Sequence, residues 1–290
     1  MPVYAIAACL RNSIAREALM TRKIPYNVLI AVGALAASFS ALAGTPASAE
    51  TVIGLVDGKT LVMIDSASGK VGKSVSISGA SDLVGIDVRP ADGMLYGVTR
   101  DGAVVTIDPS NGKAMEKSKL KTMLPAGVTA TVDFNPVADR LRLIGSDGTN
   151  LRANVDDGSV TTDGALKFAD SDMHKGETAN VIAAAYTNSV KGSKETTLYN
   201  IDATIGGLLK QAPPNDGILN AVGKLGVKVS GPVAFDIMSD GKGNNMAWLL
   251  SDGTLHKVDL TSGKAMAAGK VMGAPGMITD IAIWPSSPAM

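Results

Sequence analysis

The densest group of chemically useful side chains in this 290-residue sequence lies in the stretch DFNPVADRLRLIGSDGTNLR, from residue 133 to residue 152. Arg140 and Arg142 are two residues apart, so on a β-strand their side chains would share a face. Guanidinium groups bind carboxylates and phosphates through paired hydrogen bonds. The stretch therefore predicts an anion-binding site, with the candidate ligand-binding residues Asp133, Asn135, Arg140, Arg142, Asn150 and Arg152.

The same arginines have a structural alternative. Buried charged groups must be paired, because an isolated charge is costly to remove from water. Ion pairs of Arg140 and Arg142 with Asp133, Asp139 and Asp156 would tie neighbouring parts of the fold together. The sequence leaves both interpretations open.

A second candidate is a set of four aspartates that lie inside short apolar runs such as GIDV and AFDI, namely Asp87, Asp133, Asp236 and Asp280. We expect them at equivalent places on inner strands of the fold. Carboxylates that converge near an axis could bind a cation, calcium being the candidate, and could serve a metal-assisted hydrolase or lactonase. The alternative is that each carboxylate caps the turn that follows it through backbone amides.

Other reaction chemistries find little support in the composition. The single cysteine, Cys9, lies in the predicted targeting segment described below, and the only histidines are His174 and His256. The rest of the chain therefore has no thiol nucleophile, no disulfide and no zinc site of several histidines. The sequence also lacks a Gly-x-Ser-x-Gly nucleophile motif. No cofactor is predicted, and an enzymatic role is not favoured.

The first 49 residues are typical of a secretory signal peptide. Arg22 and Lys23 precede a short apolar run, Val28–Gly44, and small residues lead to a predicted cleavage site after Ala49. The alternative is a membrane anchor, but the run is shorter than the roughly 20 residues of a spanning helix. Residues 1–19 do not fit this pattern, which indicates Met20 as the true start. We expect an exported protein, periplasmic or extracellular, with no membrane insertion after cleavage.

The charge balance also bears on partners. The chain has 27 basic and 27 acidic residues, and its first 49 residues hold four of the bases and one of the acids. The remaining chain is therefore mildly acidic, which gives no electrostatic reason to expect nucleic acid as a partner.

One pattern recurs along residues 50–290 and must position any site. The stretch GIDVRPADGMLYGVTRDGAVVTIDPSNGKA (85–114) and the stretch AFDIMSDGKGNNMAWLLSDGTLHKVDLTSGKA (234–265) share the order of apolar runs, Asp-Gly pairs and Gly-Lys-Ala turns. Asp87 and Asp133 are 46 residues apart, and Asp236 and Asp280 are 44 apart. A period near 45 residues with four short strands per repeat is typical of a β-propeller.

The repeats predict an all-β fold, a single five-bladed β-propeller over residues 50–290. The strands are apolar on both faces, as expected for sheets buried between neighbouring blades. The C-terminal stretch ITDIAIWP supplies the first strand that the N-terminal repeat lacks, so its pairing with the N-terminal strands should close the ring. The predicted blades are 82–120, 128–168, 180–222, 231–272, and 277–285 with 51–80.

Several of these stretches together resemble a known bacterial family, domain of unknown function 4394. The resemblance is carried by GIDVRPADGMLYGV, VDFNPVADRLRLIGSDGTNLRANVDDGSVTTDGAL, AAAYTN, TTLYNID and PPNDGILNAVGKLG, in this order between residues 52 and 284. It implies a secreted or periplasmic propeller-like domain. It implies no established reaction, ligand or catalytic residue.

The sequence thus predicts an exported propeller that acts as a ligand- or protein-binding module, with the ligand at the mouth of the central channel. The partner would be a small anion, a polymer or a protein. The alternatives are a metal-assisted hydrolase or lactonase that uses the channel carboxylates, and a purely structural protein of the cell envelope.

Overall fold

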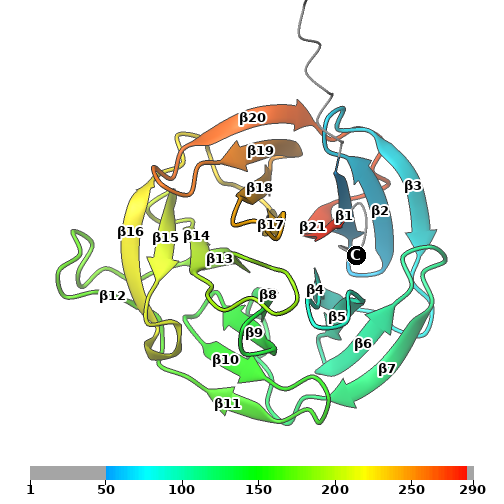
Figure 1. Cartoon of the computed structure of the whole chain (residues 1–290), viewed down its shortest axis with the longest axis horizontal. Coiled ribbons are helices and arrows are strands. Elements are labelled where there is room, and N and C mark those ends of the chain that lie inside the picture. The colour runs from blue at the N-terminus through cyan, green and yellow to red at the C-terminus, as the bar shows by residue number, and fades with distance from the viewer. Residues whose placement is uncertain (1–49, 286–290) are drawn as a thin grey trace, which may run out of the picture. The chain divides into compact units, whose positions relative to one another are not determined.

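The computed structural model describes residues 50–285, and the predicted signal peptide, the predicted start at Met20 and residues 286–290 lie outside this range. The described residues form 21 β-strands and one short 3₁₀ helix, Pro214–Asp216. The strands build five sheets arranged in a ring around a central axis, and the interior along this axis is called here the channel (Figure 1). No helix in this part of the chain is long and apolar enough to span a membrane.

Each sheet is named here as a blade, and its strands are given from the channel outward. Blade 1 holds β4 (Leu83–Val88), β5 (Leu95–Thr99), β6 (Ala103–Ile107) and β7 (Ala114–Lys119). Blade 2 holds β8 (Ala130–Asn135), β9 (Arg140–Gly145), β10 (Asn150–Ala153) and β11 (Val160–Thr162). Blade 3 holds β13 (Val181–Tyr186), β14 (Leu198–Asp202), β15 (Gly207–Gln211) and β16 (Ile218–Lys224).

Blade 4 holds β17 (Val233–Ser239), β18 (Asn245–Ser251), β19 (Thr254–Val258) and β20 (Ala265–Lys270). Blade 5 combines the two ends of the chain: β21 (Ile278–Trp284) is its inner strand, followed by β1 (Thr51–Val56), β2 (Thr60–Asp65) and β3 (Val71–Ser76). Residues of β21 and β1 pair directly, as in Leu55 with Asp280. The predicted five-bladed propeller and its closure by the C-terminal strand are therefore confirmed.

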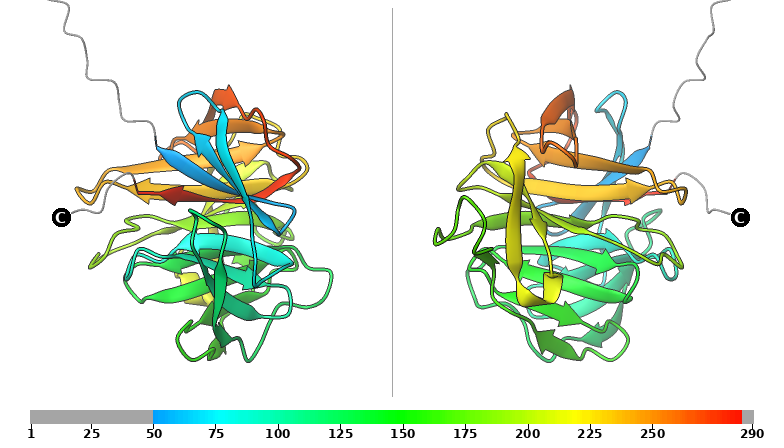
Figure 2. Two further views of the ribbon diagram at one scale, coloured as in Figure 1. Left: turned by 90° about the vertical axis from the view of Figure 1, so that its right-hand side faces the viewer. Right: turned by 60° about the vertical axis from the view of Figure 1, so that its left-hand side comes forward.

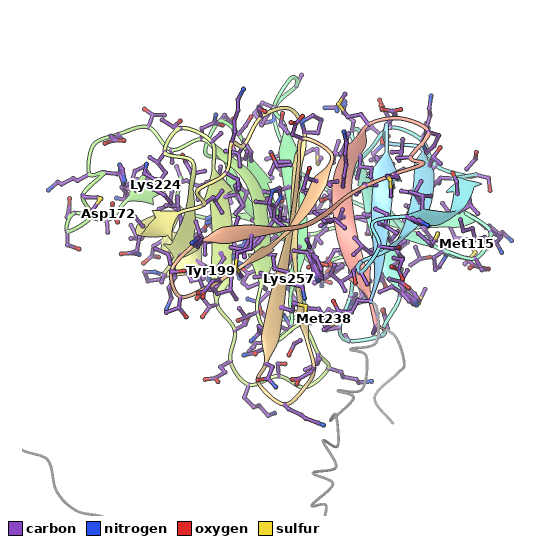
Figure 3. The ribbon with its side chains drawn as sticks, turned by 90° about the horizontal axis from the view of Figure 1, so that it is seen from above. Met115, Asp172, Tyr199, Lys224, Met238 and Lys257 are labelled. Atoms are coloured by element: carbon purple, nitrogen blue, oxygen red, sulfur yellow. The ribbon has the colours of Figure 1, made fainter. Side chains whose placement is uncertain are left out.

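One blade boundary differs from the prediction. The stretch predicted as blade 2 ends with β12 (Lys167–Phe168), which instead pairs in parallel with β16 at the outer edge of blade 3. The chain crosses to blade 3 because the Lys167 N–H donates to the Gly217 carbonyl. The loop that follows β12 also contacts blade 3, since the Ala221 N–H donates to Asp172 Oδ2 over 2.6 Å. Figure 3 shows Asp172 and Lys224 on this same side of the molecule.

The core is divided into five apolar clusters, one between each pair of neighbouring blades. Phe134 of β8 is fully buried between blades 1 and 2, where its ring meets the edge of Tyr96 at a centroid distance of 5.3 Å. Each inner strand is apolar on both faces because it has a neighbouring blade on either side. This arrangement fixes the blades relative to one another and holds their inner strands around the channel.

The recurring Gly-Lys-Ala turns have a structural role at the rim of the ring. Gly112, in the turn between β6 and β7, has a φ of +77°, which glycine adopts without strain. A Cβ at this position would also collide with the Ser76 carbonyl of blade 5. The Ser78 N–H donates to the Gly112 carbonyl, so the turn bonds directly to the neighbouring blade. The repeat is therefore a junction between blades as well as a strand connection.

The antiparallel order of the strands gives the ring two different faces. One face, called here the upper face, carries the turns between second and third strands and the loops that lead into each inner strand. The lower face carries the turns between first and second and between third and fourth strands. Figure 2 shows the ring from two further directions.

Candidate functional site

A cavity of about 820 Å³ opens at the upper face over the channel. All five blades contribute to its wall, largely through the residues at which their inner strands begin. Its wall includes the apolar side chains of Leu83, Ile182 and Val233, and Thr279 of β21 also lines it. We call this feature the upper cavity. Its wall combines apolar side chains with polar and charged groups in comparable proportion, and a concave site with both kinds of group can bind a small molecule.

Three charged residues line the upper cavity: Asp57, Asp82 and Arg100. All three side chains are exposed, and none has a hydrogen bond or ion pair with the described part of the chain. Asp57 and Asp82 have left-handed backbones, with φ of 48° and 60°. The Arg100 N–H donates to the Asp82 carbonyl over 3.0 Å, which holds these two residues side by side. Sequence analysis did not single out these three residues.

Below the cavity, three of the predicted metal-site aspartates converge in the channel. Asp87, Asp133 and Asp236 each place a carboxylate oxygen within 4.8 Å of the other two. Their exposed fractions are 8%, 3% and 5%. Each carboxylate also accepts a backbone N–H from the inner strand of the next blade: from Phe134 over 2.7 Å, from Tyr186 over 2.9 Å and from Ile283 over 2.5 Å, respectively. The carboxylates therefore link neighbouring blades around the axis.

The fourth aspartate, Asp280, does not occupy the equivalent place, which corrects the expectation of a four-membered ring. Its Oδ2 accepts the Ile86 N–H over 2.8 Å, one residue earlier on β4 than the aspartate of that strand. The hydroxyl of Thr131 makes the corresponding bond to the Ala184 N–H over 3.0 Å. Asp280 and Thr131 thus form a second level of inter-blade bonds, nearer the upper cavity.

Burial dominates the electrostatics of these groups. Loss of hydration raises the pKa of Asp236 to about 6 and the pKa of Asp280 to about 8, from an ordinary value of 3.8. Burial and the nearby carboxylates raise the pKa of Asp87 and of Asp133 well above that value. The five inner strands contain no lysine, arginine or histidine to neutralise them.

The three converging carboxylates fit a hard divalent cation in their chemistry and spacing. Calcium binds six to eight oxygens at about 2.3–2.6 Å, so ligand oxygens around one ion lie within about 5 Å of each other. Within residues 50–285, the second oxygen of Asp133 accepts no hydrogen bond, whereas both oxygens of Asp87 and Asp236 do. Asp133 therefore has an uncommitted acceptor in the channel.

The predicted arginine site has a different environment. Arg142 is 2% exposed, and its guanidinium donates to the Tyr186 hydroxyl, to Asn150 Oδ1, to Asp163 Oδ2 and to Asn215 Oδ1, over 2.6–3.1 Å. Arg152 also pairs with Asp163, at 2.9 Å. The structure thus brings Arg142, Asn150 and Arg152 together around Asp163, and protein groups engage all three guanidinium nitrogens of Arg142.

The other predicted residues of this site lie elsewhere. Arg140 donates to the carbonyls of Ala138 and Asp139 in its own turn. Asn135 accepts the N–H groups of Val137 and Ala138 and so caps that turn. Asp133 points into the channel. The six residues therefore divide among three separate environments.

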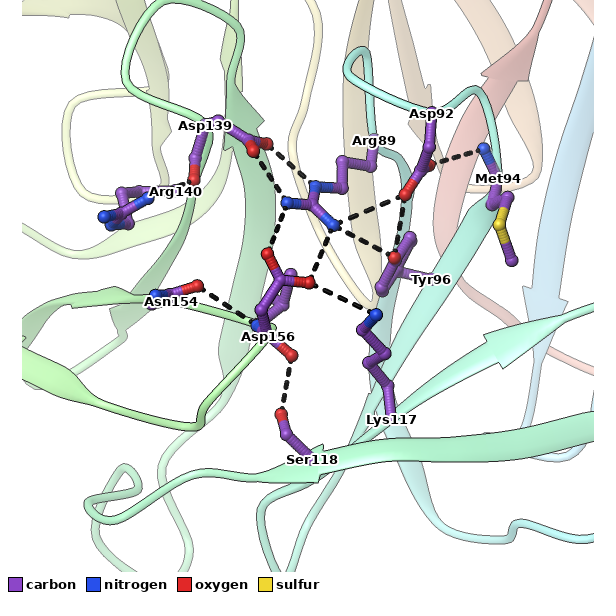
Figure 4. Close-up of polar contacts among 11 residues, drawn as sticks. Arg89, Asp92, Met94, Tyr96, Lys117, Ser118, Asp139, Arg140, Asn154 and Asp156 are labelled. Carbon is purple, nitrogen blue, oxygen red and sulfur yellow. Dashed lines mark hydrogen bonds and ion pairs between the residues drawn. The ribbon is translucent and has the colours of Figure 1, made fainter.

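Sequence analysis missed the most extensive ion-pair network in the described part of the chain, which surrounds Arg89 (Figure 4). The guanidinium contacts both oxygens of Asp139, at 2.6 and 2.8 Å, and both oxygens of Asp156, at 3.0 and 3.2 Å. It also contacts Asp92 and the Tyr96 hydroxyl. Asp139 and Asp156 belong to blade 2 and thus pair with Arg89 of blade 1, rather than with Arg140 or Arg142.

Five blades of four strands each, one of them extended by β12, form a ring that the last strand closes, and this arrangement defines a five-bladed β-propeller. The chain belongs to the family described as domain of unknown function DUF4394, whose model matches residues 43–282. The predicted family resemblance is therefore confirmed. A search of curated proteins gave no match.

The chain is also similar to several solved structures at low sequence identity. A protein of unknown function from Bacteroides caccae is 13% identical, with 76% of this chain and 72% of that chain covered and a TM-score of 0.41. A structural genomics protein of unknown function from Bacteroides thetaiotaomicron is 15% identical, with 82% and 65% covered and a TM-score of 0.47. An auxiliary nutrient binding protein from Bacteroides ovatus is 15% identical, with 67% and 55% covered and a TM-score of 0.40.

Proposed function

We propose that this protein is an exported binding module whose ligand enters the upper cavity. The observation that carries the proposal is the cavity of about 820 Å³, to which all five blades contribute. Small-molecule sites have volumes of about 300–1,000 Å³ and combine apolar walls with a few polar groups. A ring of packed sheets that presents loops around one opening is well suited to binding.

A matched pair of variants tests this proposal. Thr129 lines the cavity, so Thr129→Trp should fill it, whereas Thr261→Trp adds the same side chain on the lower face. A thermal-shift screen of the purified protein against a small-molecule library should yield compounds that raise the melting temperature. Thr129→Trp should abolish the shift, and Thr261→Trp should retain it. Compounds that stabilise all three proteins equally would contradict binding in the cavity.

The export part of the proposal rests on the N-terminal sequence. Arg22, Lys23 and the apolar run 28–44 precede small residues at the predicted cleavage site after Ala49. Expression of the full gene in a bacterium, followed by cell fractionation and mass measurement, should give an exported protein that begins at Glu50. An intact cytoplasmic chain would contradict it.

A divalent cation in the channel is a second candidate ligand. It is favoured by the convergence of Asp87, Asp133 and Asp236 together with the uncommitted second oxygen of Asp133. Calcium should raise the melting temperature, and Asp133→Asn should remove most of that shift while Asp147→Asn, in an exposed turn, leaves it unchanged. An equal rise of the melting temperature in the wild type and both variants would show that calcium binds outside the channel. A bound cation would also be the first requirement of the hydrolase or lactonase alternative.

A further inference from the structure

Acidic side chains lie both in the wall of the upper cavity and below it. Asp57 and Asp82 lie in the cavity wall, and Asp280 follows Thr279, which lies in that wall. Asp87, Asp133 and Asp236 lie deeper. The one basic residue of the cavity wall is Arg100, which is exposed.

This charge distribution has a direct consequence for the ligand. Clefts lined by charges of one sign, with apolar walls, focus the electric field and concentrate ions of the opposite sign. The cavity wall holds two exposed carboxylates, Asp57 and Asp82, and one base, Arg100, so its net charge is negative. The buried aspartates below it add to this charge only to the extent that they ionise, because burial raises their pKa. The cavity should therefore attract cations and disfavour anions.

The apolar part of the wall narrows the class of cation. Leu83, Ile182, Pro232 and Val233 line the same cavity as the two carboxylates. A small inorganic cation would contact only the carboxylates and would leave this surface in water. An organic cation can place an ammonium group beside Asp57 and Asp82 and bury its hydrocarbon part against the apolar side chains.

We propose that the ligand of the upper cavity is an organic cation, an ammonium group attached to an apolar body. This inference rests on the proposed function, because it names the ligand class of the same cavity. Asp57 and Asp82 bind the ammonium group, and their fixed left-handed backbones hold both carboxylates at the cavity wall. Arg100 lies beside Asp82 and weakens the field there, so it limits the affinity for cations.

Three probes of nearly equal size and shape distinguish the effect of ligand charge from that of ligand shape. At neutral pH benzylamine is cationic, benzyl alcohol is neutral and benzoate is anionic. Their dissociation constants for the purified protein are measured by NMR titration. Benzylamine should bind, benzyl alcohol should bind at least about fivefold more weakly, and benzoate should bind most weakly, because each nearby charge contributes roughly a factor of five. Equal affinities for benzylamine and benzyl alcohol, or no binding of benzylamine at millimolar concentration, would overturn the inference.

Isosteric variants locate the effect. Asp57→Asn and Asp82→Asn remove one charge each, and asparagine tolerates the left-handed backbone of these positions. Each should raise the dissociation constant of benzylamine about fivefold. The matched control is Asp252→Asn, because Asp252 lies in the equivalent turn of blade 4 with a φ of 49° and does not line the cavity. A melting temperature for each variant confirms that it is folded.

Arg100→Gln gives a test of opposite sign. Loss of this positive charge should lower the dissociation constant of benzylamine, whereas a weaker binding would contradict the role given to Arg100. Failure of this inference is distinct from failure of the proposed function. Binding of library compounds that Thr129→Trp abolishes would support the proposed function. If these compounds are neutral or anionic, and Asp57→Asn leaves their affinity unchanged, the cavity binds ligands of another class and only this inference fails.

Discussion

Two of the regions in which this propeller buries charged groups treat them in opposite ways. At the sides of blades 1 and 2, Arg89 and Arg142 are enclosed by carboxylates and amides that satisfy nearly all of their donors. In the channel, four aspartates are enclosed by backbone N–H groups and by one another, with no basic residue on the inner strands. The paired charges tie blade 1 to blade 2 through Arg89 and blade 2 to blade 3 through Arg142. The channel carboxylates also link neighbouring blades, but they have no basic partner, and burial raises their pKa.

Loss of Arg142 should have the largest effect. Arg142→Ala leaves Asp163, whose side chain is 5% exposed, with Arg152 as its remaining ion-pair partner, and frees the bonds to Asn150, Asn215 and Tyr186. Breaking a buried ion pair by removing one partner costs about 3–5 kcal/mol, so the free energy of unfolding should fall by this amount in urea denaturation. A loss of less than about 1 kcal/mol, together with stabilisation of the wild-type protein by phosphate, would instead favour the anion-binding interpretation of Arg142.

The Arg89 network should give a smaller effect. Arg89 is buried, but the side chains of Asp139 and Asp156 are 38% and 50% exposed and can be rehydrated. Arg89→Ala should therefore lower the free energy of unfolding by about 2–3 kcal/mol. Arg89→Lys keeps the charge but not the two paired contacts, and should recover only part of the loss. Full recovery by lysine would show that the paired geometry does not matter.

The channel aspartates should make the free energy of unfolding fall as the pH rises, whereas an aspartate in an ordinary ion pair makes it rise. Below pH 3.8 the channel aspartates are protonated in the folded and unfolded states alike. As the pH rises, the unfolded chain ionises first, because the folded-state pKa is about 6 for Asp236 and about 8 for Asp280. The contribution of these groups to the free energy of unfolding is therefore greatest at acidic pH, and it is lost as the pH rises through these folded-state pKa values.

The variant Asp280→Asn isolates the upper part of this window. It should reduce the loss of stability between about pH 6 and about pH 8 by roughly 1–2 kcal/mol, as measured by urea denaturation at a series of pH values. Asp252→Asn, in an exposed turn, should leave the pH profile unchanged. A wild-type profile that rises towards pH 8 would show that the channel holds a cation or is more hydrated than its burial indicates.

The smallest effect is expected for Arg140, which belongs to the same predicted site as Arg142. Its guanidinium bonds only to the carbonyls of Ala138 and Asp139 in the adjoining turn. Arg140→Ala should therefore change the free energy of unfolding by about 0.5 kcal/mol or less. The contrast with Arg142→Ala separates two residues that the sequence places on one strand face.

The spacing of turns was enough to predict the fold, because each Asp-Gly and Gly-Lys pair marks a turn between strands of known order. It was not enough to place Asp280. In two repeats the aspartate lies three residues before a proline, as in Asp87 before Pro90 and Asp133 before Pro136, whereas Ala282 lies three residues before Pro285. Aligning the repeats on this proline would have shown that Ala282, and not Asp280, occupies the position equivalent to Asp87 and Asp133.

The site was harder to predict than the fold because its groups come together only when the ring is formed. Arg89 meets Asp139 and Asp156 over separations of 50 and 67 residues, from a different blade. Asp57, Asp82 and Arg100 stand in ordinary turns, and nothing in their local sequence distinguishes them from Asp147 or Asp252. Asp57, Asp82 and Arg100 come together in the wall of one cavity only when the ring has formed.

Closure of the ring by the last strand sets a condition on when the protein can fold. The Thr279 hydroxyl donates to the Leu55 carbonyl, a contact between residues 224 positions apart. Until β21 is available, β1 has an unpaired edge and two of the five inter-blade clusters lack residues of their inner strand. Contacts of such long range form late and slowly. The ring therefore stays open until β21 has been made, and under the proposed export it would close only after the chain has crossed the membrane.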